Sequence, residues 1–373
     1  MRLVATRRLE GGSVLARDVV TGRHGSVPLL RRGTKINPRY IQALERAGIN
    51  AVYVEDAVSE GIVATPALTE ETRNEATRVL ERALSSARRH PDGSASLPES
   101  AVAELTNVAR LIATEISTCD DAIYALQDLA AADAYTMQHS IDVTAIGLLV
   151  GRRLFRDSGW IDYRGSRRFE KVDERVVQLG LGLILHDVGK LTVPQEVLTK
   201  NGPLDDIEWE LVKRHPMAGL DMLASSSNLS AVARTVIRSH HERWDGSGYP
   251  DGLVGNAIHQ YARVAAVADV YDAVTSERPY SKARPPHVGW QIIVEGANSH
   301  FDQEVVDTFR RVVAPYPPGS EIVLEDGCKG LVVSVEIDAP EQPLVRVVWD
   351  PDGKQIAPYE VRVDAVPTLA RAA

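Results

Sequence analysis

The sequence predicts a mainly α-helical protein in which a large central helical region lies between two small modules that contain β-strands. In the central region, apolar residues such as Ile123, Leu126 and Leu129 recur at the spacing of one helix face. At both ends, short apolar segments alternate with turn residues, which is typical of strands. A chain of 373 residues is also long for a single domain. We therefore expect four parts, residues 1–57, 58–120, 121–314 and 315–373.

Residues 1–57 predict a small α/β module. A turn signal at 21–25 separates short apolar segments, and Asn37-Pro38 begins a helix that Gly48 ends. The apolar segments, which we interpret as strands, are 13–16, 18–20, 27–30 and 51–54. A packing role is the simplest interpretation, and the roles of sensor or dimer contact stay open.

Two amphipathic helices are expected in 58–120, where they pack against the central region. The first begins after Thr69, a suitable N-cap, has Glu70 and Glu71 in its first turn, and runs to about Arg89. A turn-rich segment follows, and the second helix begins near Ser100 and runs to about residue 116.

The C-terminal part, 315–373, predicts a small β-barrel or a β-meander. The prolines in 315–319 interrupt the helical pattern. Alternating apolar segments follow, with turn residues between them, and they lie at 321–324, 330–335 and 344–349. We assign this part no chemistry.

Composition limits the kinds of partner and the compartment. The net charge of −9 argues against a protein that binds nucleic acid polymers. Cys119 and Cys328 fit two lone thiols in a reducing cytosol better than a disulfide, which is left open. No apolar run reaches the length of about 18 residues that a membrane span requires, and no secretory signal is recognisable. We expect a cytoplasmic protein without a membrane span.

The most informative segment contains two adjacent histidines, His240 and His241, followed by Glu242 and by the glycine-rich stretch 246–250. Neighbouring residues on a helix point about 100° apart, so two imidazoles can address two neighbouring points. This arrangement suits a pair of metal ions better than a single ion. The glycines and Pro250 end the helix beside a loop that can approach a ligand closely.

Two further apolar segments are interrupted by polar residues. His186 and Asp187 follow the apolar run 181–185. Asp269 and Asp272 are three residues apart, and therefore lie on one face of an otherwise apolar helix. Burying carboxylates and imidazoles is costly unless they are paired or bound to metal. The three interruptions together indicate one buried metal site.

These segments resemble the HD-GYP family, the branch of HD-domain metal-dependent phosphohydrolases that cleaves cyclic di-GMP. The resemblance runs in order from about residue 135 to about residue 309, and it implies an all-helical HD-domain bundle. A His-Asp doublet alone is a weak signal, but the ordered set is specific. The matching text is His186-Asp187-Val188-Gly189-Lys190, His215-Pro216, residues 240–250, Ala268-Asp269-Val270-Tyr271-Asp272-Ala273 and Ser276-Glu277-Arg278-Pro279-Tyr280.

The resemblance implies two divalent metal ions, with Asp187 as the bridging ligand. Nitrogen and oxygen donors without cysteine favour Fe or Mn, with Zn, Co or Ni as alternatives. Two metals can activate a water that attacks phosphorus and expels the ribose 3′ oxygen. The implied ligands are His139, His186, Asp187, His215, His240, His241 and Asp269.

The resemblance also implies roles around the metals. Lys190 lies one helical turn after His186 and can offer its ammonium to developing negative charge. Asp272 either orients the nucleophile or carries a proton, or instead supports a ligand. Arg278 and Lys282 suit phosphate oxygens. Gly246, Gly248, Tyr249 and Pro250 line the guanine-nucleotide pocket, and their loop is also a candidate contact for a partner protein.

Two departures from the family pattern carry predictions. Tyr135 stands where members with three metals have a glutamate, so we predict two metals and the linear dinucleotide pGpG as main product. Asp142, one turn after His139, is the alternative third-metal ligand. The polar segment 151–175 is longer than usual, and we interpret it as a solvated insertion, with a hairpin over or beside the site and phosphate-attracting arginines as further alternatives.

Two other functions are weighed against a cyclic di-GMP phosphodiesterase. One is a cyclic di-GMP receptor with little turnover, which acts through partner binding. The other is an HD-domain hydrolase of another cyclic dinucleotide. The intact His-Asp doublet and the intact glycine-rich loop argue against the receptor, but they do not distinguish cyclic dinucleotides. A homodimer also stays open.

Overall fold

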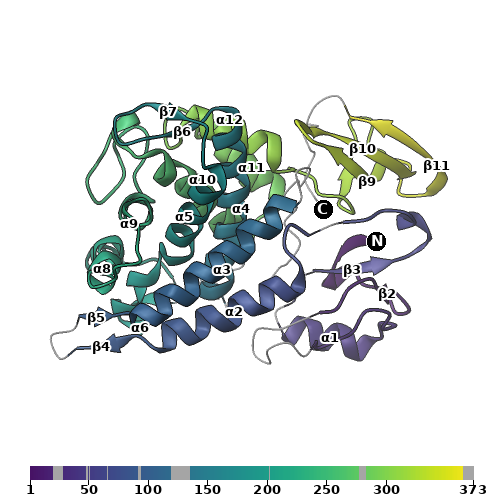
Figure 1. The fold of residues 1–373 in the computed structure, drawn as a ribbon. Helices are drawn as coiled ribbons and strands as arrows, with labels where there is room; N and C mark the ends of the chain where they lie inside the picture. The colour runs from purple at the N-terminus through teal and green to yellow at the C-terminus, as the bar shows by residue number, and fades with distance from the viewer. Residues whose placement is uncertain are drawn as a thin grey trace.

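The computed structural model describes residues 1–19, 28–47, 49, 51–64, 66–90, 94–118, 135–200, 202–276 and 283–363, without the side chains of 135 and 136. A helical bundle forms most of the molecule, and the two small β-containing modules lie next to each other at one end of it (Figure 1). The backbone N–H of Leu3 donates to the carbonyl of Gly319 at 3.0 Å, which joins these two modules directly. The predicted mainly α class is therefore confirmed.

The centre of the bundle consists of four helices, α3 (Glu99–Thr118), α4 (Tyr135–Asp157), α5 (Val172–Leu185) and α10 (Gln260–Thr275). α10 is buried on almost every side, which its apolar sequence requires. Shorter helices surround this centre, and they are α6 (Gln195–Leu198), α7 (Asp206–Lys213), α8 (His215–Met222), α9 (Ala231–Ser239), α11 (Pro286–Glu295) and α12 (Gln303–Val312). Among the described residues, no helix is long and apolar enough to cross a membrane.

The helical region before the bundle begins as the sequence predicts. The Thr69 side chain accepts a hydrogen bond from the backbone N–H of Thr72, and α2 (Glu70–Ser85) follows it. α2 ends earlier than predicted, because Arg88–Arg89 (β4) pairs with Ala95–Ser96 (β5) in a short hairpin. α2 and α3 then pack on the bundle and share its hydrophobic core.

The N-terminal module is a three-stranded antiparallel sheet with the order β1-β3-β2 and one helix, α1 (Pro38–Arg46). Asn37 caps α1 by accepting the backbone N–H of Tyr40. The strands are β1 (Arg2–Ala5), β2 (Val14–Leu15) and β3 (Ala51–Glu55), with Leu3 opposite Tyr53. Sequence reasoning missed β1, and Val19 and Leu30 form an isolated bridge where two strands were expected.

The C-terminal module is an antiparallel meander with the strand order β11-β10-β9-β8. Its strands are β8 (Glu321–Val323), β9 (Lys329–Glu336), β10 (Ala339–Trp349) and β11 (Gln355–Arg362). Of the two forms expected, the structure therefore shows the meander. Ion pairs such as Arg310–Glu341, with 2.9 Å between nitrogen and oxygen, attach the module to α12.

The insertion contains a hairpin at the end of α4 that is remote from His139, so the alternative of a hairpin over or beside the site is not supported. α4 continues to Asp157, and β6 (Trp160–Ile161) then pairs with β7 (Arg167–Arg168). At 1.5 Å per residue, the end of α4 is about 27 Å along the helix from His139. The insertion arginines also have partners there, since Arg167 pairs with Glu304 and Arg168 with Asp162.

Candidate metal centre

Five helix segments bring the predicted metal ligands together. His139 is in the second turn of α4, and Asp269 lies within α10. His186 is the C-cap of α5, and Asp187 precedes a 3₁₀ turn, Val188–Thr192. His240 is the C-cap of α9, directly followed by His241. The C-terminal ends of α5 and α9 thus position polar side chains beside the core without interrupting a helix.

His215 is the first residue of α8, directly after the end of the preceding helix. α7 ends at Lys213, and Pro216 then occupies the first turn of α8. A close approach fixes this corner, because a Cβ on Gly189 would lie 2.0 Å from the carbonyl oxygen of His215. Glycine at 189 therefore allows the His-Asp turn to contact the start of α8.

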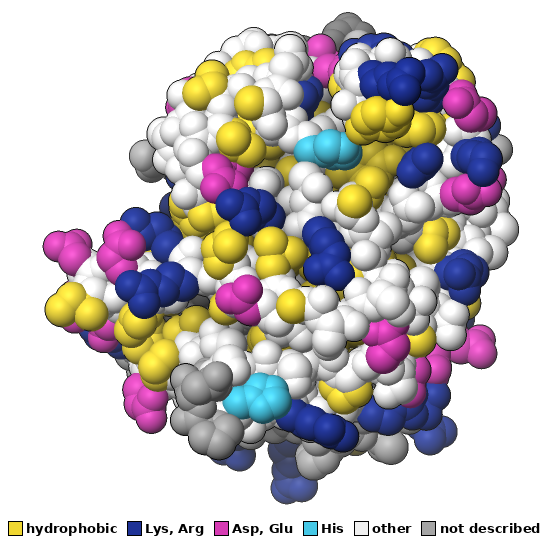
Figure 2. Space-filling model, turned by 60° about the vertical axis from the view of Figure 1, so that its left-hand side comes forward, with side chains coloured by type: hydrophobic (Ala, Val, Ile, Leu, Met, Phe, Trp, Pro, Cys, Tyr) yellow, Lys and Arg dark blue, Asp and Glu magenta, His cyan; other side chains and the backbone are white. Residues whose placement is uncertain are grey.

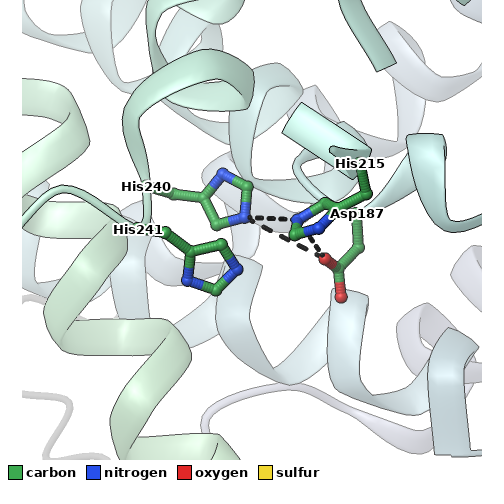
Figure 3. Close-up of side chains that lie close together, drawn as sticks. All are labelled: Asp187, His215, His240 and His241. Atoms are coloured by element: carbon green, nitrogen blue, oxygen red, sulfur yellow. Dashed lines mark hydrogen bonds and ion pairs between the residues drawn. The ribbon is translucent and has the colours of Figure 1, made fainter. Parts of the chain in front are cut away.

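The seven predicted ligands form two adjacent groups. Asp187, His215, His240 and His241 make one group, and Figure 3 shows their side chains converging. His139, His186 and Asp269 make the other. Within each group, one candidate ligand atom from every residue lies within 4.8 Å of the others. Asp187 lies between the groups, because its Oδ1 is 3.2 Å from His215 Nε2 and its Oδ2 is 3.5 Å from His139 Nε2.

Hydrogen bonds fix the orientation of four of the five histidine rings. Carbonyl and carboxylate oxygens only accept, so each Nδ1 carries the proton and Nε2 is directed into the site. The Nδ1–H groups donate from His186 to Leu183 O at 2.6 Å, from His215 to Val212 O at 2.8 Å, from His240 to Ile237 O at 3.0 Å and from His139 to Asp272 Oδ2 at 2.6 Å.

This orientation leaves acceptors facing one another. His215 Nε2 and His240 Nε2 are 3.1 Å apart, and in the neutral rings both carry lone pairs. Among the described residues, His186 Nε2 and Asp187 Oδ1 are also buried without a hydrogen-bond partner. Buried polar atoms are otherwise almost always satisfied, and converging lone pairs repel. The residues present therefore fit one or more cations at this position.

The charges of three of the histidine rings fit the same interpretation. Burial lowers the pKa of His215 to about 4 and that of His241 to about 3, and it holds the pKa of His240 well below its ordinary value. These rings therefore stay neutral at pH 7 and keep their lone pairs. Burial opposes protonation of His139, but hydrogen bonds with three surrounding carboxylates raise the pKa of this ring well above its ordinary value.

Asp187 and Lys190 form an ion pair at the edge of the site. The Lys190 ammonium donates to Asp187 Oδ2 at 2.6 Å, and the lysine side chain is 28% exposed. Burial alone would raise the pKa of the Asp187 carboxyl group, but Lys190 and the neighbouring histidines hold this pKa well below its usual range. Asp187 is therefore ionised throughout the physiological range and available to bind cations.

Asp272 lies behind His139 and does not reach the converging ligand atoms. It is fully buried, one oxygen accepts from His139 Nδ1, and the other accepts from Ser276 Oγ at 2.8 Å. Asp269, one helical turn earlier, lies within the ligand group. The two carboxylates that the sequence placed on one helix face therefore have different surroundings.

The glycine-rich loop forms one wall of the site. The Tyr249 ring packs on the His241 ring with 4.7 Å between centroids. A Cβ on Gly248 would lie 2.3 Å from the backbone nitrogen of Arg243, so only glycine fits. Gly246 has φ +82°, which also favours glycine. Pro250 follows Tyr249 through a cis peptide bond.

Glu242 organises this loop, a role that sequence reasoning missed. Its side chain is buried, Oε1 accepts the backbone N–H of Asp251 at 2.7 Å, and Oε2 accepts that of Leu253 at 2.9 Å. An acidic residue directly after the two histidines was the available signal. Figure 2 shows the side of the molecule that carries α8 and α9, where histidine and hydrophobic side chains reach the surface and basic side chains are spread among them.

Some predicted residues lie outside the described part of the chain. Arg278 and Lys282 fall within 277–282, and the side chain of Tyr135 is likewise not described. Asp142 is described, and it does not join either ligand group, because its oxygens are bonded to Arg73 and Gln138. The alternative in which Asp142 replaces a metal-binding glutamate is therefore not supported.

Residues 158–305 match the profile of the HD domain family, so this chain carries an HD domain. This match confirms the predicted resemblance to HD-domain proteins, and the ordered motifs described above are those of the HD-GYP branch.

The curated relatives of this chain are named as phosphodiesterases of cyclic dinucleotides. The chain is 37% identical over 241 residues to the cyclic di-GMP phosphodiesterase PA4108 of Pseudomonas aeruginosa, covering 65% of this chain and 54% of that protein. It is 39% identical over 127 residues to the 3′3′-cGAMP-specific phosphodiesterase 2 of Vibrio cholerae, covering 33% and 24%. The matched region thus spans about half the length of the first relative and about a quarter of the length of the second. Among solved structures it is similar to Bd1817, a HDG"Y"P protein from Bdellovibrio bacteriovorus, with 13% identity, a TM-score of 0.46, and coverage of 82% of this chain and 97% of that one.

Proposed function

We propose that this protein is a metal-dependent phosphodiesterase that hydrolyses cyclic di-GMP to linear pGpG in bacterial second-messenger signalling in the cytoplasm. The observation that carries the proposal is the pair of adjacent ligand groups with their nitrogen lone pairs directed inward. Relatives named cyclic di-GMP phosphodiesterases support the choice of substrate.

The two groups would hold two divalent metal ions, with Asp187 between them. His215, His240 and His241 belong to one subsite, and His139, His186 and Asp269 belong to the other. Their nitrogen and oxygen donors favour Fe or Mn, with Zn, Co or Ni possible. Metals bound there would supply activation of water and neutralisation of phosphate charge. In the overall reaction, water adds across the P–O3′ bond, with hydroxyl to phosphorus and a proton to the ribose oxygen.

The neighbouring charged residues divide into two roles. We assign Asp272 the supporting role, because its oxygens hold His139 and Ser276 and are thus not free to orient a nucleophile. Lys190 stabilises ionised Asp187, and its partial exposure lets the same ammonium meet a phosphate oxygen. Asp187 then has a catalytic role as the shared ligand of both subsites.

The dinucleotide would bind against the wall formed by the glycine-rich loop. Tyr249 offers an aromatic face beside His241, and Gly246, Gly248 and Pro250 shape the backbone around it. Arg278 and Lys282 stay candidates for phosphate contacts on sequence grounds. We also retain the loop as a candidate contact for a partner protein and the homodimer as a candidate assembly.

The seven ligands and the occupied oxygens of Asp142 favour two metals. By resemblance, a two-metal centre favours pGpG as the main product over complete hydrolysis to GMP. A second candidate substrate is 3′3′-cGAMP, because relatives specific for that dinucleotide match the same region.

The proposal is tested by titrating metal-free protein with Mn²⁺ under anaerobic conditions. The initial rate of hydrolysis is measured at each step with cyclic di-GMP and with 3′3′-cGAMP. We expect activity to follow the second equivalent of metal and to favour cyclic di-GMP. A preference for 3′3′-cGAMP would select the second candidate, and tight binding without turnover would select a receptor.

A further inference from the structure

A buried ion pair connects the helical region before the HD domain with the helix that carries His139. Arg73 on α2 donates from Nη1 to Asp142 Oδ1 on α4 at 2.6 Å. The side chains are 17% and 5% exposed, so the pair is largely removed from water. Removing one partner of such a pair is costly, because a buried charge is left uncompensated. Both residues lie outside the 158–305 range that matches the family profile.

The pair belongs to a network around His139. Asp142 Oδ2 accepts from the Gln138 side chain at 2.8 Å, so residues on both sides of His139 in α4 are joined. Burial raises the pKa of Asp142 to about 6, with Arg73 opposing this rise and the charge of nearby Asp272 adding to it. Asp272 is the carboxylate that holds His139 Nδ1. Arg73 therefore supplies the positive charge beside Asp142, which lies one helical turn after His139 and near the carboxylate that holds this ligand.

The position of His139 explains why such support is needed. His139 is the fifth residue of α4, and the ends of helices fray because their terminal groups lack intrahelical partners. An ion pair to α2 on the adjacent turn fixes the start of α4 against the bundle. Outer partners of metal-binding side chains commonly change metal affinity 10- to 100-fold.

We propose that Arg73 is a positioning residue for the metal subsite of His139, His186 and Asp269. The helical region before the HD domain then supports metal binding, because α2 helps to position His139, and it links the N-terminal part of the chain to the metal centre. This inference rests on the two-metal centre proposed above.

The test compares Arg73→Met, Arg73→Lys and the wild-type full chain by titration of metal-free protein with Mn²⁺ against a competing chelator. Arg73→Met is expected to weaken the binding of one of the two Mn²⁺ ions about 10- to 100-fold and to leave the other within about threefold. Arg73→Lys, which keeps the charge, is expected to restore most of the affinity. Arg78→Met is the matched control, because Arg78 lies on the same helix, is 64% exposed and pairs with Glu75.

A second variant separates positioning from folding. Arg73→Met leaves Asp142 unpaired, so Arg73→Met/Asp142→Asn removes both charges and is expected to fold while it keeps the metal defect. If the folded double variant or Arg73→Met binds both ions as tightly as wild type, the inference is overturned and the metal centre stands. If wild-type protein binds fewer than two Mn²⁺ ions, the proposed centre fails and the inference fails with it.

Discussion

The glycine-rich loop is expected to depend on one buried carboxylate, and Glu242→Gln tests this dependence. Glu242 accepts two backbone N–H groups, from Asp251 and Leu253, with one oxygen each. A glutamine amide has only one oxygen, so its NH₂ group must face the other N–H. The substitution preserves size and removes one acceptor and the charge.

The magnitude follows from the two hydrogen bonds. The loss of a charge-assisted hydrogen bond together with an unsatisfied, partly buried donor costs about 2 kcal/mol. Because about 1.4 kcal/mol corresponds to a factor of ten in an equilibrium constant, 2 kcal/mol favours local opening of the loop by about 30-fold. The ligand side chains keep their own hydrogen bonds, so metal content should not change.

Hydrogen exchange measured by mass spectrometry reports this opening directly. The amides of Asp251 and Leu253 should exchange about 30-fold faster in Glu242→Gln, and the KM for cyclic di-GMP should rise by up to the same factor. Glu210→Gln is the control, because Glu210 is a surface residue paired with Lys213 at 62% exposure. Unchanged protection of both amides in Glu242→Gln would refute the assigned role of this carboxylate.

Three further predictions concern the ligands, the loop and pH. His186→Ala combined with Asp187→Ala should reduce bound metal and turnover to background in a folded protein, as checked by elemental analysis and circular dichroism; hydrolysis at the wild-type rate would contradict the site assignment. Gly248→Ala should lower activity at least about tenfold with metal retained, because its Cβ would meet backbone atoms at 2.3 to 2.6 Å. Metal-free protein should lose thermal stability as pH falls from about 6.5 towards 4, because three buried histidines with lowered pKa stay neutral when folded but bind protons when unfolded. His139, with its raised pKa, has the opposite effect, because its stabilisation is present in acid and is lost only as pH rises through that pKa. A melting temperature that stays constant between about pH 6.5 and 4 would contradict the burial of the three neutral rings.

The sequence was most informative where a local chemical cost could be recognised. Thr69 was identified as a cap because helix starts need side-chain acceptors, and the structure confirms it. The helix predicted to begin at Asn37-Pro38 is present, with Asn37 as its cap. Polar residues in apolar segments indicated a buried metal site at His186, Asp187, His240, His241 and Asp269, because their burial requires partners. His139 and His215 were implied only by the family resemblance, and all seven residues fall into two adjacent groups.

Long-range contacts were not predictable from local pattern. Arg73 and Asp142 are 69 residues apart, and nothing in either segment indicates the other. The place of the insertion could not be decided from the sequence for the same reason, because only the full length of α4 shows that its hairpin is remote from His139. The position of His215 at the start of α8 likewise depends on a contact between distant residues, the close approach of Gly189 to the His215 carbonyl.

Two adjacent ligand groups are proposed to hold two metal ions, and the enzyme is proposed to hydrolyse a single phosphodiester bond of cyclic di-GMP. A chromatographic time course tests this proposal most directly, with cyclic di-GMP added to anaerobically prepared Mn- or Fe-loaded protein. The account predicts that pGpG accumulates while GMP stays near background. Rapid formation of GMP would contradict the two-metal centre, and the absence of any turnover with either metal would contradict the assignment as a phosphodiesterase.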